Sequence, residues 1–218
     1  MESKILDERQ IKFLEEFQKI PFLKDNFYLT GGTALAAFYL KHRYSEDLDF
    51  FSEKEIDLLN LDTSLKKLQK TLKPNKVDFQ QSYNRNLFFL SFGKHILKTE
   101  FTYFPFLRID SKVSKKGISV DSLIDIAVNK LFTIYQRVAA RDYIDLYFII
   151  EREDFKINDL ILKAKAKFDW NVDPIQLGAQ FVKSGEAEDF PRMIEKIKTA
   201  VWRKFFIDEA KKLKRKII

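Results

Sequence analysis

Cysteine is absent from the chain, and glycine and proline are scarce, with six and five residues among 218. Without cysteine there is no disulfide framework and no thiolate metal site. No apolar run approaches the roughly 18 residues that a membrane-spanning helix needs. The charged start of the sequence, MESKILDERQIKF, lacks the apolar core of a signal peptide. These absences predict a cytoplasmic protein with no membrane segment.

What the chain does contain is typical of a folded globular protein. Hydrophobic residues make up 45% and charged residues 33%, a balance that excludes an intrinsically disordered chain. The net charge of +7 and the pI of about 9.3 are compatible with a nucleic acid or a polyphosphate ligand, although many basic proteins bind neither. His42 and His95 stand apart in the sequence, so neither a zinc site nor a catalytic histidine is predicted.

The most informative stretch is residues 27–51, FYLTGGTALAAFYLKHRYSEDLDFF. Its start alternates aromatic and aliphatic residues like a strand. The strand stops at Gly31 and Gly32, where missing Cβ atoms allow backbone amides to approach a ligand. Thr33 then begins a run to Leu40 with strong helix propensity. A strand, a glycine turn and a helix N-terminus favour a bound anion, because free N–H groups and the helix dipole point at it.

Two acids follow on the next predicted strand. Asp47 and Asp49 are two positions apart and therefore share one face, while Leu48 and Phe50 share the other. Two adjacent carboxylates repel each other unless a cation lies between them, and oxygen ligands of this kind suit Mg²⁺. A phosphate-binding turn and a pair of metal-binding acids on one short unit indicate nucleotide chemistry. The alternative is a strand–helix–strand unit whose two acids are only solvated.

The rest of the first half is predicted to alternate helices and strands. Apolar residues recur at helical spacing in two segments, residues 5–19 and 58–72. Three strands are predicted next, at residues 77–83, 87–92 and 96–103, and the turn Gly93-Lys94-His95 joins the last two as a hairpin. On the third strand Glu100 shares a face with Lys98 and Thr102. Glu100 is therefore a candidate third acid near the Asp47 strand, or else an exposed strand residue.

The second half of the chain has helical periodicity. Lys130, Arg137 and Arg141 are spaced seven and four residues apart, so one helical face is predicted to present three cations. A face of that kind can neutralise a triphosphate. Alternatively it is a solvated basic face, in which the two arginines only pair with Asp142 and Asp145.

Together these motifs resemble a known family. The order of a strand, Gly31-Gly32, a helix, R-x-S-x-D and L-D-F, written here as GGTALA and HRYSEDLDFF, resembles the polymerase-β-like nucleotidyltransferase superfamily. Within it, the motifs resemble the AbiEii/AbiGii branch, the toxin component of type IV toxin–antitoxin pairs. The segment from Lys130 to Leu146 is similar to the second block of that family, K-x₆-R-x₃-R-D-x₂-D-L. Glu100 departs from the family pattern, which usually has Asp at the third acid.

The resemblance implies an α+β fold with a nucleotidyltransferase-like mixed β-sheet flanked by helices. It implies a nucleotidyltransferase core in residues 1–115 and a helical C-terminal region in residues 116–218 that completes the active-site cleft. The implied enzyme transfers NMP from an NTP to an acceptor hydroxyl with Mg²⁺, typically at a two-metal site. Its metal ligands and its catalytic residues are then Asp47, Asp49 and Glu100, joined in catalysis by Lys130 and Asp142. Its nucleotide-binding residues are Gly31, Gly32, Thr33, Arg43, Ser45 and Lys130.

The resemblance also implies an RNA acceptor, the 3′ end of tRNA, and a cognate antitoxin protein. The last predicted helix, residues 195–216, runs into the basic segment KKLKRKII, which either holds an RNA backbone or ends as a solvated helix terminus. Nothing in the residues separates RNA from a protein hydroxyl or a small-molecule hydroxyl as acceptor. A non-catalytic nucleotide-binding regulator and a small-molecule nucleotidyltransferase are therefore the alternatives.

Overall fold

The computed structural model of the protein describes residues 5–111 and 113–214. Contacts divide the chain into two compact units, the first made of Met1–Tyr39, Tyr44–Leu107 and Ser111–Ser122. The second unit is made of Leu40–Arg43, Arg108–Asp110 and Leu123–Ile218. The main division thus falls after Ser122, whereas the functional boundary predicted after residue 115 stays a prediction. Among the described residues, no helix combines the length and the apolar character that crossing a membrane requires.

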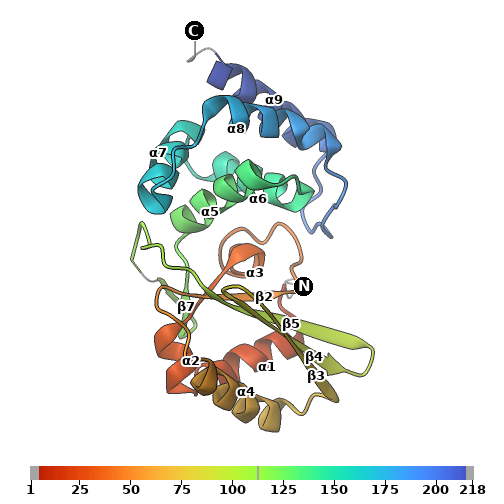
Figure 1. Cartoon of the computed structure of the whole chain (residues 1–218). Coiled ribbons are helices and arrows are strands. Elements are labelled where there is room, and N and C mark those ends of the chain that lie inside the picture. The colour runs from red at the N-terminus through yellow and green to blue at the C-terminus, as the bar shows by residue number, and fades with distance from the viewer. Residues whose placement is uncertain (1–4, 112, 215–218) are drawn as a thin grey trace. The chain divides into compact units, whose positions relative to one another are not determined.

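The first unit is built on a seven-stranded mixed sheet with the strand order β3-β4-β5-β2-β1-β7-β6 (Figure 1). The strands are β1 (Tyr28–Thr30), β2 (Leu48–Ser52), β3 (Lys76–Ser82), β4 (Arg85–Phe92), β5 (His95–Tyr103), β6 (Val113–Lys115) and β7 (Ile118–Val120). β2 runs parallel to β5 and β1 runs parallel to β7, while the other neighbours are antiparallel. The predicted α+β class is confirmed, as is the hairpin of β4 and β5.

Helices cover both faces of this sheet. Three helices lie on one face (Figure 1), namely α1 (Glu8–Phe17), α2 (Pro21–Asn26) and α4 (Leu58–Leu72). The short helix α3 (Gly31–Leu35) lies on the other face and continues as the π-helical turn η1 (Ala36–Leu40). The predicted helices at 5–19 and 58–72 are thus α1 and α4, and the helix predicted from Thr33 begins at Gly31.

Stacked phenylalanines fix α1 to the central strands. The ring of Phe50 stacks on Phe17 with centroids 4.4 Å apart and on Phe101 with centroids 5.1 Å apart, and all three side chains are buried. Because side chains alternate across a strand, burying Phe50 and Phe101 turns the neighbouring Asp49 and Glu100 toward the opposite face. The hydrophobic core therefore decides which face of the sheet carries the acids.

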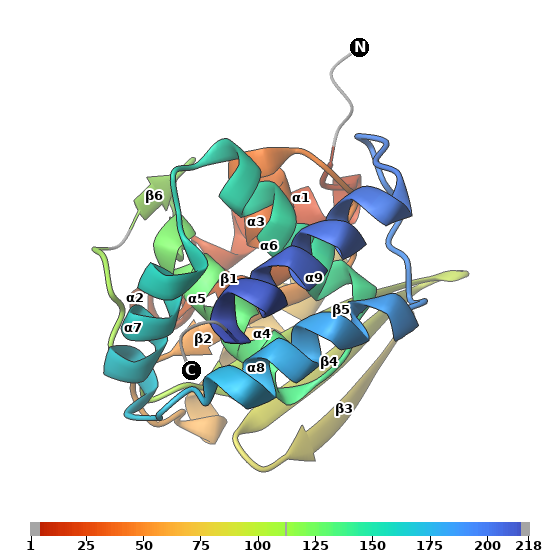
Figure 2. The same cartoon turned by 90° about the horizontal axis from the view of Figure 1, so that it is seen from above.

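The second unit is helical. Its elements are α5 (Leu123–Gln136), α6 (Ala140–Arg152), α7 (Ile157–Phe168), α8 (Pro174–Val182), the 3₁₀ turn η2 (Lys183–Glu186) and α9 (Thr199–Lys214). α8 and α9 lie side by side (Figure 2). The buried ring of Tyr143 on α6 contacts Trp202 and Phe206 of α9, with centroids 6.1 and 5.0 Å apart. Burying these aromatic rings stabilises the packing of α6 against α9.

The predicted continuous face of three cations is wrong. α5 ends at Gln136 and α6 begins at Ala140, so Lys130 and Arg141 lie on different helices and Arg137 lies between the helices. Ala139 is extended (φ −150°, ψ 122°), and the amide of Ala140 donates to the carboxylate of Asp189. This side-chain partner comes from far along the sequence, which is why local spacing did not reveal the break.

Candidate active site

Gly31 and Asp49 meet at the junction of β1, β2 and α3. Thr30 of β1 pairs with Asp49 of β2, so the first residue of α3 lies beside the aspartate. Gly31 has a left-handed backbone with φ +71°, and a Cβ added there would lie 2.6 Å from Asp49 Oδ2. Glycine is therefore required at position 31 for two reasons, the left-handed backbone conformation and the closeness of the Asp49 carboxylate.

Asp49 and Glu100 face each other across the parallel pair of β2 and β5, where they are register partners. We call these two residues the acid pair. The guanidinium of Arg85 on β4 donates to both oxygens of Glu100, from Nε to Oε1 at 2.6 Å and from a terminal nitrogen to Oε2 at 2.7 Å. The hydroxyl of Thr102 donates to Oε1 at 2.8 Å. Burial alone would raise the pKa of Glu100, but these hydrogen bonds outweigh it and hold the pKa below its ordinary value.

Asp47 lies just before β2 and carries a cation of its own. Its Oδ2 accepts from Lys98 Nζ at 2.7 Å, and Lys98 shares its face of β5 with Glu100. The loop that leads to Asp47 is held by Thr33, whose buried hydroxyl donates to the backbone carbonyl of Asp47 and is hydrogen-bonded to the Ser45 hydroxyl at 2.8 Å. Thr33 and Ser45, predicted to bind phosphate, thus also shape the loop, and their phosphate contacts stay a prediction.

The second unit holds a buried cluster of ion pairs. Lys130 Nζ of α5 lies 2.7 Å from Asp142 Oδ1 and 2.6 Å from Asp145 Oδ2, both acids being on α6. Asp145 also accepts from Arg43 at 2.6 and 2.8 Å and lies 2.8 Å from His42 Nε2. Because Lys130, Arg43 and His42 all contact Asp145, its carboxylate is fixed in one position. These contacts therefore hold α5, α6 and the segment with His42 together.

Charges inside this cluster shift the ionisation of its members. Burial alone would lower the pKa of Lys130, but Asp142 and Asp145 raise it above the ordinary value. Burial alone would raise the pKa of Asp145, but Lys130 and Arg43 hold it well below the usual range. For His42 burial dominates, and its pKa is lowered although Asp145 opposes the shift. His42 is therefore a neutral ring at neutral pH.

The structure sorts the predicted residues into two groups. The first unit carries Gly31, Gly32, Thr33, Ser45, Asp47, Asp49 and Glu100, and the second unit carries Arg43, Lys130 and Asp142. Arg43 was predicted to bind phosphate beside Ser45; its guanidinium forms a buried ion pair with Asp145, and its phosphate contact stays a prediction. Asp145 contacts Lys130 at 2.6 Å. Arg137 contacts Asp142 at 2.9 Å, as its alternative interpretation expected.

Sequence reasoning missed three residues next to these groups: Arg85, Lys98 as a partner of Asp47, and His42. Arg85 was within reach of sequence reasoning, because the turn after Phe92 fixes the hairpin register. That register places Arg85 opposite Thr102 and Leu87 opposite Glu100, so Arg85 is the diagonal neighbour of Glu100. The pairing of His42 with Asp145 joins residues about a hundred positions apart, and no local pattern signals it.

The acid pair fits a divalent cation in its chemistry. Two carboxylates on neighbouring rigid strands offer oxygen ligands of the kind Mg²⁺ takes, and the missing Cβ of Gly31 leaves space against Asp49 Oδ2. In residues 5–111 and 113–214, no group of three or more His, Cys, Asp or Glu side chains is placed to hold a metal ion. The metal site of Asp47, Asp49 and Glu100, with Glu100 as the third acid, therefore stays a prediction.

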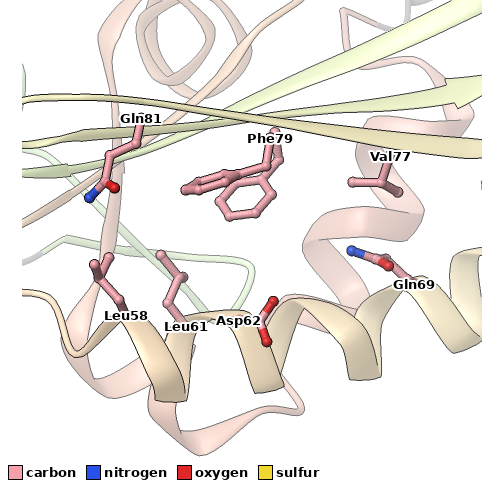
Figure 3. A pocket seen from close by; sticks show the side chains of 8 residues that line it. Leu58, Leu61, Asp62, Gln69, Val77, Phe79 and Gln81 are labelled. Atoms are coloured by element: carbon pink, nitrogen blue, oxygen red, sulfur yellow. The ribbon is translucent and has the colours of Figure 1, made fainter.

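A separate pocket of about 380 Å³ opens between α4 and the strands β3 and β4 (Figure 3). Phe79 projects from β3 toward Leu61 of α4, and Val77 lies over Gln69 of the same helix. This is the α4 face of the sheet, opposite the face of the acid pair. Its position separates it from the candidate active site.

Comparison with known proteins agrees with this geometry. Residues 12–214 match the family described as "Nucleotidyl transferase AbiEii toxin, Type IV TA system". The chain is 32% identical over 165 residues to the uncharacterized protein aq_aa25 of Aquifex aeolicus (strain VF5), a match that covers 75% of this chain and 76% of that protein.

Solved structures share the fold at low sequence identity. JHP933 from Helicobacter pylori aligns with a TM-score of 0.62 at 21% identity, over 96% of this chain and 90% of that chain. MenT4, the nucleotidyltransferase toxin Rv2826c from Mycobacterium tuberculosis H37Rv, aligns with a TM-score of 0.58 at 14% identity, over 94% of this chain and 84% of that chain. With the family match over nearly the whole sequence, the chain belongs to the AbiEii nucleotidyltransferase toxins of type IV toxin–antitoxin systems and is an NTP-using nucleotidyltransferase.

Proposed function

We propose that the enzyme transfers an NMP group from an NTP to a hydroxyl of RNA, with the 3′ end of tRNA as the acceptor, and that it requires Mg²⁺. The observation that carries the chemistry is the acid pair, Asp49 and Glu100, in register on adjacent strands beside the Cβ-free Gly31. A site of this kind supplies fixed carboxylate oxygens next to a backbone that a phosphate can approach closely.

In the proposed reaction the acceptor oxygen forms a bond to the α-phosphorus while the bond from that phosphorus to the pyrophosphate oxygen breaks. The hydroxyl proton passes to an oxygen of the acid pair. Bound Mg²⁺ would neutralise the charge that develops on the phosphate oxygens. Asp49 and Glu100 would hold the ion, with Asp47 as the proposed third ligand, while the amides of Gly32 and Thr33 face the phosphates. The rigid strands keep these groups in line for the transfer.

Lys130 and Asp142 are assigned to the same reaction through their resemblance to the second sequence block of the family. Both are buried and paired with each other, so they have a structural role whatever they do in catalysis. Their catalytic assignment is therefore tested by variants in which activity and stability are measured separately.

The RNA acceptor rests on family membership and on charge. Type IV toxins act beside an antitoxin, so an antitoxin protein is the proposed partner. The net charge of +7 favours a polyanionic acceptor. At the end of α9, Lys211 and Lys212 are exposed and pair with Asp208 and Glu209. Arg215 and Lys216 belong to the same basic segment, and their proposed contacts with RNA phosphates fall outside the described residues.

The test is to incubate the protein with each labelled NTP, Mg²⁺ and total cellular RNA or total protein, and to follow which pool takes up label. Label in the tRNA fraction, absent with Asp49→Asn, supports the proposal. Label in protein or in small molecules would identify that pool as the acceptor in place of RNA. Nucleotide binding without any transfer would favour the regulatory alternative. RNA affinity should also fall by about 0.7 log units per log unit of salt for each phosphate neutralised.

A further inference from the structure

Cations of the chain itself occupy the acids of the candidate metal site. Arg85 donates to both oxygens of Glu100, at 2.6 and 2.7 Å, and Lys98 donates to Asp47 at 2.7 Å. The two oxygens that Arg85 engages are the oxygens with which Glu100 would ligate a metal. A bidentate guanidinium and a metal ion both need them, because a carboxylate has limited lone pairs on its two oxygens.

The two partners of this ion pair differ in how firmly they are held. The Glu100 side chain is 8% exposed and is also fixed by Thr102, whereas the Arg85 side chain is 55% exposed. Arg85 therefore lies at the water-facing end and can move away without opening the core. It cannot leave by losing a proton, because an arginine stays charged throughout the physiological range.

We propose that Arg85 is an internal counter-ion that holds Glu100 until Mg²⁺ displaces it. This inference rests on the proposed metal-binding role of Glu100. In the metal-free enzyme Arg85 neutralises Glu100, which would otherwise stand beside Asp49 as a second negative charge. Metal binding then exchanges one cation for another, so the affinity for metal is set by a competition within the chain. Lys98 is the equivalent competitor at Asp47.

The test is to measure Mn²⁺ affinity by electron paramagnetic resonance for the wild type, Arg85→Gln and Arg85→Lys, with thermal unfolding to confirm that each variant is folded. Arg85→Gln should bind Mn²⁺ about five- to tenfold more tightly, because an ion pair of this kind stabilises its partners by about 1 kcal/mol. Arg85→Lys keeps the positive charge but loses the planar guanidinium that binds both oxygens of Glu100. Its Mn²⁺ affinity should therefore lie between those of the wild type and Arg85→Gln. The matched control is Arg9→Gln, since Arg9 pairs with Asp7 at 2.8 Å on the exposed end of α1.

The outcomes separate the inference from the proposed function. If Glu100→Gln and Asp49→Asn bind Mn²⁺ as the wild type does, the acid pair is not the metal site and the proposed function fails. If these variants lose Mn²⁺ while Arg85→Gln is unchanged or weaker, only the competition is overturned. An Arg85→Lys affinity equal to that of the wild type would reduce the effect to long-range charge and overturn the competition as well. In the proposed case, the Nε–H resonance of Arg85 shifts during a Mg²⁺ titration.

Discussion

Asp49 and Glu100 are opposite each other across the only parallel contact of β2 within the described sheet, and Phe50 and Phe101 are opposite each other one residue later. The two phenylalanines stack in the core with centroids 5.1 Å apart. A slip of either strand by one residue would turn its phenylalanine out of the core and place its acid among the core rings. The core thus places the acid pair, and a site on such strands is held more precisely than a site on loops.

Replacing Asp49 by Asn should reduce nucleotide transfer at least about a hundredfold, because a proposed metal ligand is lost. The free energy of unfolding should stay within about 1 kcal/mol of the wild type, since the change removes one of two adjacent like charges. Transfer of labelled NMP and urea unfolding followed by circular dichroism measure the two effects. The control is Glu46→Gln, an exposed acid of the preceding loop. Full activity of Asp49→Asn would end the catalytic assignment.

A comparison of two glycines separates the effect of backbone strain from an effect on the candidate active site. Gly31 and Gly93 both have left-handed backbones, with φ +71° and +61°, so either Ala substitution should cost about 1–2 kcal/mol of unfolding free energy. An added Cβ at Gly93 meets nothing within 4 Å, whereas at Gly31 it lies 2.6 Å from Asp49 Oδ2. The short carboxylate rotates more easily than the backbone shifts. Gly31→Ala should therefore lose transfer activity as well.

The comparison is made on the two variants side by side, with urea unfolding for stability and Mn²⁺ affinity for the site. Equal losses of stability and a loss of metal affinity confined to Gly31→Ala would agree with the placement of Asp49. If Gly31→Ala retains both metal binding and transfer, the closeness of Gly31 and Asp49 has no part in the function.

Periodicity predicted the long elements of this fold and missed several of the short ones. α4 and the strands β4 and β5 have several apolar residues at the spacing of their secondary structure, and each buried residue adds to the same periodic signal. α2 has six residues and β6 and β7 have three each, too few for a period to appear. β7 is placed by its pairing with β1, where Leu29 meets Val120, and β6 pairs in turn with β7.

The site was predictable where it depends on the alternation of side chains between the two faces of a strand. Asp49 and Glu100 come to one face because alternate residues do, and the resemblance to the family pointed to the same acids. The partners of those acids were not predicted. Arg85 could have been found from the register of the hairpin, whereas no motif indicates that Lys98 pairs with Asp47. The cation face failed for a related reason, since Asp189 caps α6 from 49 positions away.

Lys130→Met should destabilise the second unit by about 3–5 kcal/mol, because Asp142 and Asp145 would be left as buried carboxylates without this cation. Urea unfolding followed by tryptophan fluorescence reports on this unit, since Trp170 and Trp202 both belong to it. The double variant Lys130→Met/Asp142→Asn should recover part of the loss.

The matched control is Lys163→Met on the exposed face of α7, which should change the unfolding free energy by less than about 0.5 kcal/mol. Activity is then compared at a temperature at which both variants are folded. A Lys130→Met variant that is as stable as the wild type yet inactive would contradict the structural role and leave Lys130 to the reaction itself.

His42 should make the stability of the second unit depend on pH. Its ring is buried with Nε2 at 2.8 Å from Asp145, and its pKa is lowered by burial, with further contributions from Arg43 and Arg152. In the unfolded chain the His42 ring therefore takes up a proton near pH 6.5, whereas in the folded chain it does so only at lower pH. Stability is complete above pH 6.5 and falls as the pH drops, by up to about 1.4 kcal/mol per pH unit.

The chain has two histidines, so the exposed His95 is a natural control for this effect. Between pH 7.5 and pH 5.5, the unfolding free energy of the wild type and of His95→Gln should fall more than that of His42→Gln. The comparison uses the slope and not the absolute value, because replacing His42 also removes its contact with Asp145 and lowers stability at every pH. Equal slopes in all three proteins would show that His42 takes up its proton in the folded state as readily as in the unfolded chain.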